Sequence, residues 1–549
     1  MGRYASVPED WTADGVMPEA VARYEADIQH LEALFDAPLS PERRKRTARL
    51  LQEWQAALEG LDWQGLSLSD RTDALLLLRH IRLTYWLMEE EELRFRQVCQ
   101  SLPQAEELVS MLDAHRRLED PEPRACAEAL TRTAEALQEL AGKLESGTVD
   151  GVTALRLWRF LRDLPRVLTA WRDFWHGYEP FLTWWVQQPY DELNRRLTEC
   201  IEKAEKTASG DDKAAIIGDP VGREALEKDL SLEMIPYTPE ELIEVGQREA
   251  EWCRTEMRKA AAEMGCGDDW RAALEKVKQD HVPPGEQARF VRELAREAVT
   301  FLEERQLIRV PELARDGWHI EMMSPDRQRV NPFFLGGDRI VVSYPKSDMT
   351  HSEKLMSMRA NNRHFSRATV QHELIPGHYL QHFSRERYRR YRRLFCTPFW
   401  VEGWALYWEM RLWELGFPRT PEERMGMLFW TLHRAARIIF SLRFHLGEMT
   451  TADCVEMLVN EVGHERSTAE GEVRRSFGGE YPPLYQCAYL IGGLQFRALH
   501  RELVEAGGMA ERDFHEGILR ENSMPVAVLR AVLSGEELSK DWRPSWRFV

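Results

Sequence analysis

The chain has no Cys-x-x-Cys pair, and its eight cysteines stand singly along 549 residues. This spacing argues against a disulfide framework and against a zinc site built from thiolates. The first residues, MGRYASVPEDW, contain no apolar segment of the kind found in secretory signals. Together these two absences predict a reducing, cytoplasmic location.

Long apolar runs are also missing. No stretch approaches the roughly 20 apolar residues that cross a bilayer, so we expect no membrane partner. The net charge of −18 argues against a nucleic-acid partner. One basic run, SRERYRRYRRLF at Ser384–Phe395, departs from this average, and we interpret it as a solvated helix face beside a binding cleft. The sequence indicates no oligomeric state.

What the chain does contain is helical periodicity. Apolar residues recur at three- and four-residue spacing from residue 17 to about residue 205, the pattern of successive amphipathic helices. Glycine, aspartate and proline then cluster in ASGDDKAAIIGDPVG and end this periodicity. We therefore predict an N-terminal helical region at 1–208, a linker at 209–235 and a catalytic region at 236–549.

Two helix starts are marked by capping residues. Ser40 stands directly before Pro41, and serine at the cap with proline in the first turn is a common start. Thr238 and Glu241 have the spacing of a capping box, with Pro239 between them at the first helical position. Both regions are therefore expected to be helical from these points onward.

Strand signals occur in one place only. GWHIEMMS and DRIVVSYP are short and alternating or β-branched, and FFLGGD before the second of them provides a Gly-Gly turn. We expect a small sheet at residues 317–345, with helices following to about residue 535. The predicted fold is thus mainly α, a large helical body with a small β-sheet beside the segment considered next.

The segment QHELIPGH, at Gln371–His378, resembles the His-Glu-x-x-His zinc motif but separates its histidines by six residues. In an uninterrupted helix, side chains six residues apart diverge by about 120° and could not share one ion. Pro376 cannot donate the bond that would reach the carbonyl of His372, and Gly377 permits backbone angles that other residues avoid. We therefore predict a helix break at Pro376 that brings the two imidazoles together.

The residue after the first histidine is Glu373, which would flank the metal as a general base for its water. Glu402, in FWVEGWALYWEM, follows His378 by 24 residues and is surrounded by tryptophans, where a carboxylate is costly unless it is paired or bound to metal. It would complete a His₂Glu zinc site. Glu409, on the same helix face, could orient a ligand imidazole. A structural carboxylate remains the alternative for Glu402.

A second histidine spacing competes with this one. His378 and His382 are four residues apart in HYLQH and need no helix break to share a metal. The usual chemistry places a carboxylate directly after the first histidine, however, and that position holds Tyr379. We therefore favour His372 and His378 as the ligand pair.

Four segments carry a resemblance to a known family: TVQHELIPGHYLQH, VEGWALY, RAARIIFSLRFH and CAYLIGGLQFRALH. In this order they are similar to the blocks of a bacterial family of zinc-peptidase-like proteins catalogued as domain of unknown function 885. The resemblance runs from about residue 225 to 505. It implies a largely helical, gluzincin-like zinc protein with a deep cleft between its two regions. It also implies metal ligands at His372, His378 and Glu402, with Glu373 as the base.

Three further residues follow from the same resemblance. In related helical zinc peptidases a histidine and a tyrosine from later helices stabilise the oxyanion, which nominates His445 and Tyr489. Arg437 could hold a substrate carboxylate by a bidentate pair. Ordinary packing or salt-bridge roles are the alternatives for all three. The chain departs from the family before His445, where FSLRFH replaces an Asp-Thr-Gly-type stretch.

These features predict a zinc-dependent hydrolase, a metallopeptidase acting on a peptide or small amide substrate. The strand near residues 338–345 would align an extended substrate by backbone pairing. One alternative keeps the metal but acts on a small non-peptide metabolite as a hydrolase or lyase. A second is a catalytically silent metal-binding scaffold.

Overall fold

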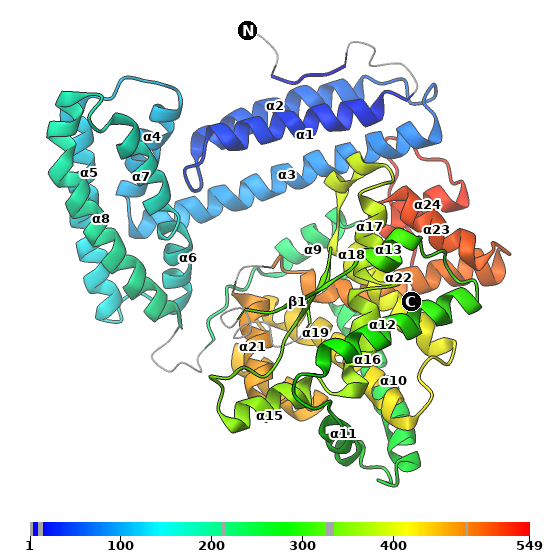
Figure 1. Cartoon of the computed structure of the whole chain (residues 1–549). Helices are drawn as coiled ribbons and strands as arrows, with labels where there is room; N and C mark the ends of the chain where they lie inside the picture. Colours follow the sequence, from blue (N-terminus) through cyan, green and yellow to red (C-terminus); the bar gives the residue numbers. More distant parts are fainter. Residues whose placement is uncertain (1–3, 9–14, 210–215, 325–333, 479–480) are drawn as a thin grey trace. The chain divides into compact units, whose positions relative to one another are not determined.

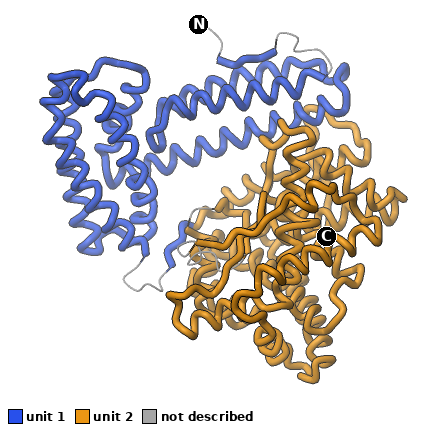
Figure 2. The backbone as a smooth tube through the Cα atoms, viewed as in Figure 1, with its two compact units in different colours: residues 1–219 blue, residues 220–549 orange. Residues whose placement is uncertain are grey.

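The computed structural model describes residues 4–8, 15–209, 216–324, 334–478 and 481–549. The chain divides into two compact units, Met1–Asp219 and Pro220–Val549 (Figure 2). This boundary lies inside the segment predicted as a linker, but Arg223–Leu232 of that segment form a helix, α9. Leu226 and Leu230 are four residues apart and both buried, which explains why this part of the segment is helical.

All the described secondary structure of unit 1 is helical. Ser40 accepts a hydrogen bond from the backbone nitrogen of Arg43 at 3.0 Å, which confirms the predicted helix start. Helices α5 and α8 lie side by side (Figure 1), and their leucines form the centre of the core of this unit. The elements are α1 Met17–Leu34, α2 Pro41–Glu59, α3 Leu68–Ser101, α4 Gln104–Arg116, α5 Pro123–Glu145, α6 Gly151–Leu161, α7 Leu164–Trp175 and α8 Pro180–Ser209.

In its described residues, unit 2 is helical apart from one small sheet, as the sequence predicts. The capping box at Thr238 and Glu241 is present at the start of α10. After α9 the helices are α10 Pro239–Glu263, α11 Trp270–Gln279, α12 Gln287–Glu304, α13 Glu312–Gly317, α15 His351–Ala360, α16 Arg363–Glu373, α17 His378–Arg385, η1 Arg390–Phe395, α18 Pro398–Glu414, α19 Pro421–His445, α20 Thr451–Met457, η2 Leu458–Val462, α21 Arg466–Phe477, α22 Tyr485–His500, η3 Arg501–Ala506, α23 Glu511–Glu521 and α24 Val526–Ser534.

The sheet consists of β1 Ile320–Met322 and β2 Ile340–Val342, which run parallel. On its other side, Val341 of β2 exchanges two backbone hydrogen bonds with Leu335, of 3.0 and 2.8 Å. Since β2 is paired on both sides, the outer segment is 334–337 and not 338–345. The prediction that β2 forms the free edge is therefore wrong, because the chain turns after Leu335 and pairs this residue with Val341.

Two helices of unit 2 cross at a pair of glycines. A Cβ atom built on Gly403 of α18 would lie 2.6 Å from the Cα of Gly492 of α22, closer than any real side-chain contact. The absence of side chains at both positions lets the two backbones touch. This contact brings Glu402, next to Gly403, close to the side chains on the first turns of α22.

Among the described residues, no helix is both long and apolar enough to cross a bilayer.

Candidate metal centre

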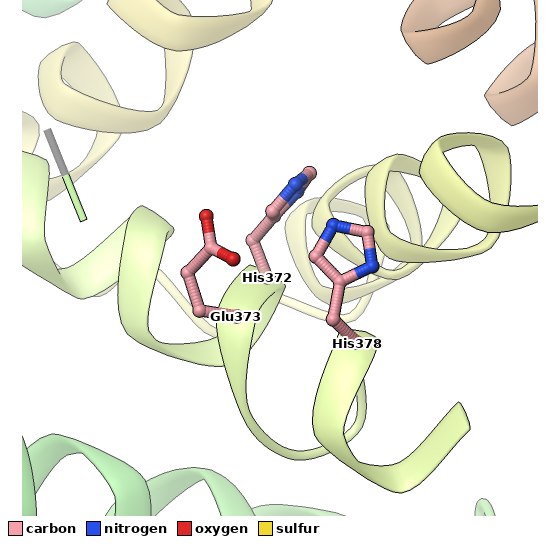
Figure 3. Close-up of side chains that lie close together, drawn as sticks. All are labelled: His372, Glu373 and His378. Carbon is pink, nitrogen blue, oxygen red and sulfur yellow. The ribbon is translucent and has the colours of Figure 1, made fainter. Parts of the chain in front are cut away.

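The helix carrying the histidine motif is interrupted at the predicted place. Helix α16 ends at Glu373, and α17 begins at His378 (Figure 3). The backbone nitrogen of Gly377 donates to the carbonyl of Gln371 at 3.0 Å. A Cβ at position 377 would lie 1.8 Å from the carbonyl oxygen of His372. Gly377 has φ −75° and ψ −133°, a combination that other residues avoid, so both the predicted backbone angles and this close approach require glycine.

The two imidazoles converge across this break. Their ring centroids lie 4.7 Å apart, and the ring planes are nearly perpendicular, at 89°. One ligand atom from each of His372, Glu373 and His378 lies within 4.8 Å of the others, and Figure 3 shows all three side chains rising from adjoining ends of α16 and α17. His382 is not part of this cluster, so the geometry favours the first of the two predicted histidine pairs.

Glu402 joins the cluster from α18. Its Oε2 lies 3.6 Å from Nε2 of His372 and 3.1 Å from Nε2 of His378. Ligand atoms at the corners of a zinc tetrahedron, each about 2.1 Å from the ion, are separated by about 3.4 Å. The hydroxyl of Tyr485 donates to the other oxygen, Oε1, at 2.5 Å. Glu402 is thus held where a third ligand belongs.

Glu409 orients the first imidazole, as the sequence predicts. Its Oε1 accepts a hydrogen bond from Nδ1 of His372 at 2.7 Å, and Nη2 of Arg434 lies 3.3 Å from the same oxygen. Since Nδ1 is engaged by Glu409, Nε2 is the nitrogen of His372 that faces the point shared with His378. This arrangement would suit a metal ligand and its supporting carboxylate.

Glu373 differs from these two carboxylates because none of the described residues forms a hydrogen bond or ion pair with it. It is nevertheless buried, with 8% of its surface exposed, and burial raises the pKa of its carboxyl above the usual value. The outer segment of the sheet passes directly over it, since a Cβ at Gly336 would lie 2.2 Å from its Oε2. Glu373 is therefore positioned by its surroundings but free to accept a proton.

The charges of the centre suit a divalent cation. Three buried carboxylates (Glu373, Glu402 and Glu409) surround the imidazoles. Burial alone would lower the pKa of His372, but contacts with Glu402 and Glu409 outweigh it and raise this pKa to about 9. Burial would raise the pKa of Glu402, and the two imidazoles instead hold it well below the ordinary value. Two imidazole nitrogens and one carboxylate are a donor set that zinc accepts in catalytic sites.

A cavity of about 520 Å³ opens onto this centre. Its walls come from α16, α17, α18, α19, α21 and α22 and from the segment 334–337, all within unit 2. The predicted cleft between the two regions of the chain stays a prediction. Tyr489 lines the cavity, and its ring stacks on that of His372 with centroids 6.3 Å apart.

The structure does not bring the other two predicted residues into their expected roles. Arg437 lines the cavity, but its Nε donates to Glu472 at 2.7 Å and its guanidinium lies over the ring of Tyr489. It is therefore not a free bidentate clamp. His445 is absent from the described residues that line the cavity, because it ends α19 eight residues, or about 12 Å, beyond Arg437. Its ring packs against Phe477 instead.

The comparisons with other proteins place this geometry in a family. A family model described as "Bacterial protein of unknown function (DUF885)" matches residues 28–533. The chain belongs to the DUF885 family. No curated protein matches it.

Two solved structures share the fold of this DUF885 protein. One, described as "a putative lipoprotein of unknown function from Shewanella oneidensis", superposes with a TM-score of 0.68 at 17% identity and covers 94% of this chain and 99% of that chain. The other, "the putative lipoprotein from Colwellia psychrerythraea", has a TM-score of 0.53 at 15% identity and covers 75% of each chain. At these identities the likeness shows the fold alone.

The prediction of a cytoplasmic location is contradicted by these two structures, since both are described as lipoproteins. The prediction depended on the scattered cysteines and on the composition of the first residues. The eight cysteines are free in the structure. Free thiols show that disulfides do not form, but they do not define a compartment.

The cavity residues of this DUF885 protein that were not predicted from the sequence include Arg434, Arg475, Tyr481 and Tyr485. A signal existed for two of them. Arg434 precedes Arg437 by three residues and Tyr485 precedes Tyr489 by four, which places each pair on one face of a helix. Arg475 and Tyr481 reach the cavity only through long-range packing.

Proposed function

We propose that this DUF885 protein is a zinc-dependent hydrolase of the gluzincin type that cleaves peptide or amide bonds. The observation that carries the proposal is the convergence of His372, His378 and Glu402 on one point, with the carboxylate of Glu373 beside it. Glu402 is restrained by both imidazoles and by Tyr485, whereas Glu373 has no such contacts among the described residues. The first carboxylate suits a ligand and the second suits a base.

When bound at this donor set, a zinc ion supplies a Lewis acid for a carbonyl oxygen and lowers the pKa of water. Glu373 then receives the proton of the attacking water on a carboxylate oxygen and returns it to the leaving nitrogen. Its raised pKa brings the carboxyl closer to neutral pH, where a general base works best. Burial keeps competing water away from it.

Tyr489 supports the developing negative charge. Its hydroxyl oxygen accepts a hydrogen bond from Nη2 of Arg475, at 3.4 Å, which leaves its own proton to be donated into the cavity. The ring lies against His372, one of the proposed ligands. A donor prepositioned for an oxyanion is a large contributor to amide hydrolysis.

The segment 334–337 provides a place for an extended substrate. Its residues line the cavity, and Gly336 passes over Glu373. Leu335 is paired to Val341 on one side only, among the described residues, so the opposite side of the segment offers backbone groups for pairing with a peptide. A peptide held there would cross above the proposed base.

The test combines metal content with turnover. Protein purified without chelators is analysed for metal, and peptide and amide libraries are incubated with wild type and with Glu373→Gln. We expect one zinc ion per chain in both proteins, and turnover only in wild type. Zinc without turnover in either protein would favour a silent scaffold, while absence of zinc, or equal turnover in both, would contradict the proposal.

A further inference from the structure

Arginines are unusually frequent in the cavity wall. Four of them line it, at positions 385, 434, 437 and 475. Arg434 is paired with Glu409, and Arg437 is paired with Glu472. Arg385 contacts the thiol of Cys396 and, like Arg475, forms no ion pair among the described residues. Of these two unpaired arginines, Arg475 is the one that contacts Tyr489, beside the proposed ligand His372.

Arg475 forms no ion pair among the described residues, and its Nε has no hydrogen-bond partner there although it is buried. Among the described residues its side chain forms one hydrogen bond, from Nη2 to the hydroxyl of Tyr489 at 3.4 Å. Its guanidinium also lies 5.0 Å from the ring centroid of Tyr481. The side chain is only partly exposed, and no carboxylate among the described residues is hydrogen-bonded to it, so a bound anion would supply the missing partner.

Tyrosines connect this guanidinium to the proposed ligands. Tyr489 accepts from Arg475 and stacks on His372. The Tyr481 ring lies 4.3 Å from that of Tyr485, whose hydroxyl donates to Glu402. One aromatic ring, that of Tyr489, thus lies between Arg475 and the proposed ligand His372, and two rings connect it to Glu402.

The chemistry of the side chain identifies the anion. The planar fork of a guanidinium matches a carboxylate and binds it through two parallel hydrogen bonds. The buried carboxylate of Glu472, on the same helix, is already engaged by Arg437. A second arginine beside this pair leaves a net positive charge at one end of the cavity, and a substrate carboxylate would neutralise it.

We propose that Arg475 binds the terminal carboxylate of the substrate, so that the protein acts near the carboxyl end of peptides. This inference rests on the proposed hydrolase function and specifies its substrate class. An acidic side chain carries the same chemical group, and the experiment below separates the two sources.

The test measures binding and needs no turnover. Zinc-loaded Glu373→Gln protein is titrated calorimetrically with the tripeptide Ala-Ala-Ala, with its C-terminal amide, and with the amide of Ala-Glu-Ala. We expect the free acid to bind at least about tenfold more tightly than either amide. In the Glu373→Gln background, a second substitution, Arg475→Gln, should remove this preference. Arg475→Lys keeps the charge but lacks the two-pronged guanidinium, so it should retain only part of the preference.

Arg474→Gln is the matched control, because it removes the same charge from the adjacent, exposed position of α21. It should leave the preference intact. Thermal unfolding and zinc content are measured for each variant, so that misfolding is separated from lost recognition. Equal binding of acid and amide, or an equal loss for both in Arg475→Gln, would overturn the proposal.

Tighter binding of the amide of Ala-Glu-Ala than of Ala-Ala-Ala would overturn the assignment to a chain terminus in favour of an acidic side chain. Failure of the hydrolase proposal is recognised separately, by missing zinc or by wild-type protein that turns over no peptide. Wild type that cleaves acid and amide at equal rates would leave that proposal standing and refute this one.

Discussion

The indole nitrogen of Trp404 donates a hydrogen bond of 2.9 Å to the carbonyl oxygen of Pro376, inside the helix break. This bond joins the two sequence segments that carry the metal centre. In the run Glu402–Trp404, the first residue is a proposed ligand, the second permits the crossing of α18 and α22, and the third fixes the break. Three consecutive residues of α18 thus connect this helix to α22 and to the break between α16 and α17.

Replacing Trp404 by Phe removes this hydrogen bond and leaves a buried carbonyl unsatisfied. We expect a loss of about 1–3 kcal/mol in the free energy of unfolding, together with weaker zinc binding. Denaturant unfolding and competition with a chelator measure the two effects. Trp400→Phe is the control, since the indole nitrogen of Trp400 is equally buried and has no partner among the described residues. Equal effects in both variants would contradict the anchoring role.

Gly377→Ala should prevent the imidazoles from converging. The added methyl group would lie 1.8 Å from the carbonyl oxygen of His372, so the backbone of the break must move. We expect zinc binding to fall by at least about a hundredfold, as when a ligand loses its orientation. Gly471→Ala is the control, because a Cβ there meets nothing within 4 Å. Retention of wild-type zinc affinity in Gly377→Ala would refute this explanation of the motif.

Gly336→Ala should separate catalysis from metal binding. Its methyl group would collide with Oε2 of Glu373, and the three atoms nearest to it all belong to Glu373 and not to a proposed ligand. Displacing the base by about 1 Å should lower turnover about a hundredfold, with zinc content unchanged. The two measurements are made on the same preparation. Loss of zinc in this variant would show instead that Glu373 is a ligand.

Stability should fall in mild acid because of buried neutral histidines. Burial lowers the pKa of His515 to about 3, against 6.5 for an exposed histidine, so the unfolded chain binds a proton that the folded chain refuses. This contribution is complete above pH 6.5 and is lost progressively as the pH falls toward 3. Between pH 7.5 and pH 5 it should cost about 2 kcal/mol.

His515→Gln tests this assignment. His515 receives a hydrogen bond from the hydroxyl of Tyr407 at 2.7 Å and contacts the carbonyl of Leu307 at 2.8 Å, and a neutral amide can serve both. Unfolding by denaturant at pH 7.5 and pH 5 should show a pH dependence smaller by about 2 kcal/mol in the variant. Identical pH dependence in the two proteins would mean that His515 does not cause the loss of stability in mild acid.

Much of the fold follows from local sequence. Helix starts at Ser40 and Thr238 are read from capping residues, and the amphipathic periodicity is local as well. The break at Pro376 is equally local, because proline removes one donor and glycine removes one side chain at adjacent positions. The helix starts and the helix break each depend on residues close in sequence, so the local sequence pattern is enough to predict them.

The rest of the site depends on contacts between distant residues. Tyr485 meets Glu402 only because Gly403 and Gly492 let two helices touch, and no local pattern specifies that crossing. The role given to His445 came from likeness to other peptidases, and the length of α19 places that residue beyond the cavity. The outer segment of the sheet was misassigned for the same reason, since it depends on a single pairing, between Leu335 and Val341.

The central claim is that His372, His378 and Glu402 bind one zinc ion. X-ray absorption at the zinc edge of the purified protein tests it most directly. We predict two imidazole nitrogens and oxygen donors at about 2.0–2.2 Å, no sulfur, and loss of the bound zinc in His378→Ala. A sulfur ligand near 2.3 Å, or an unchanged spectrum in that variant, would contradict the account.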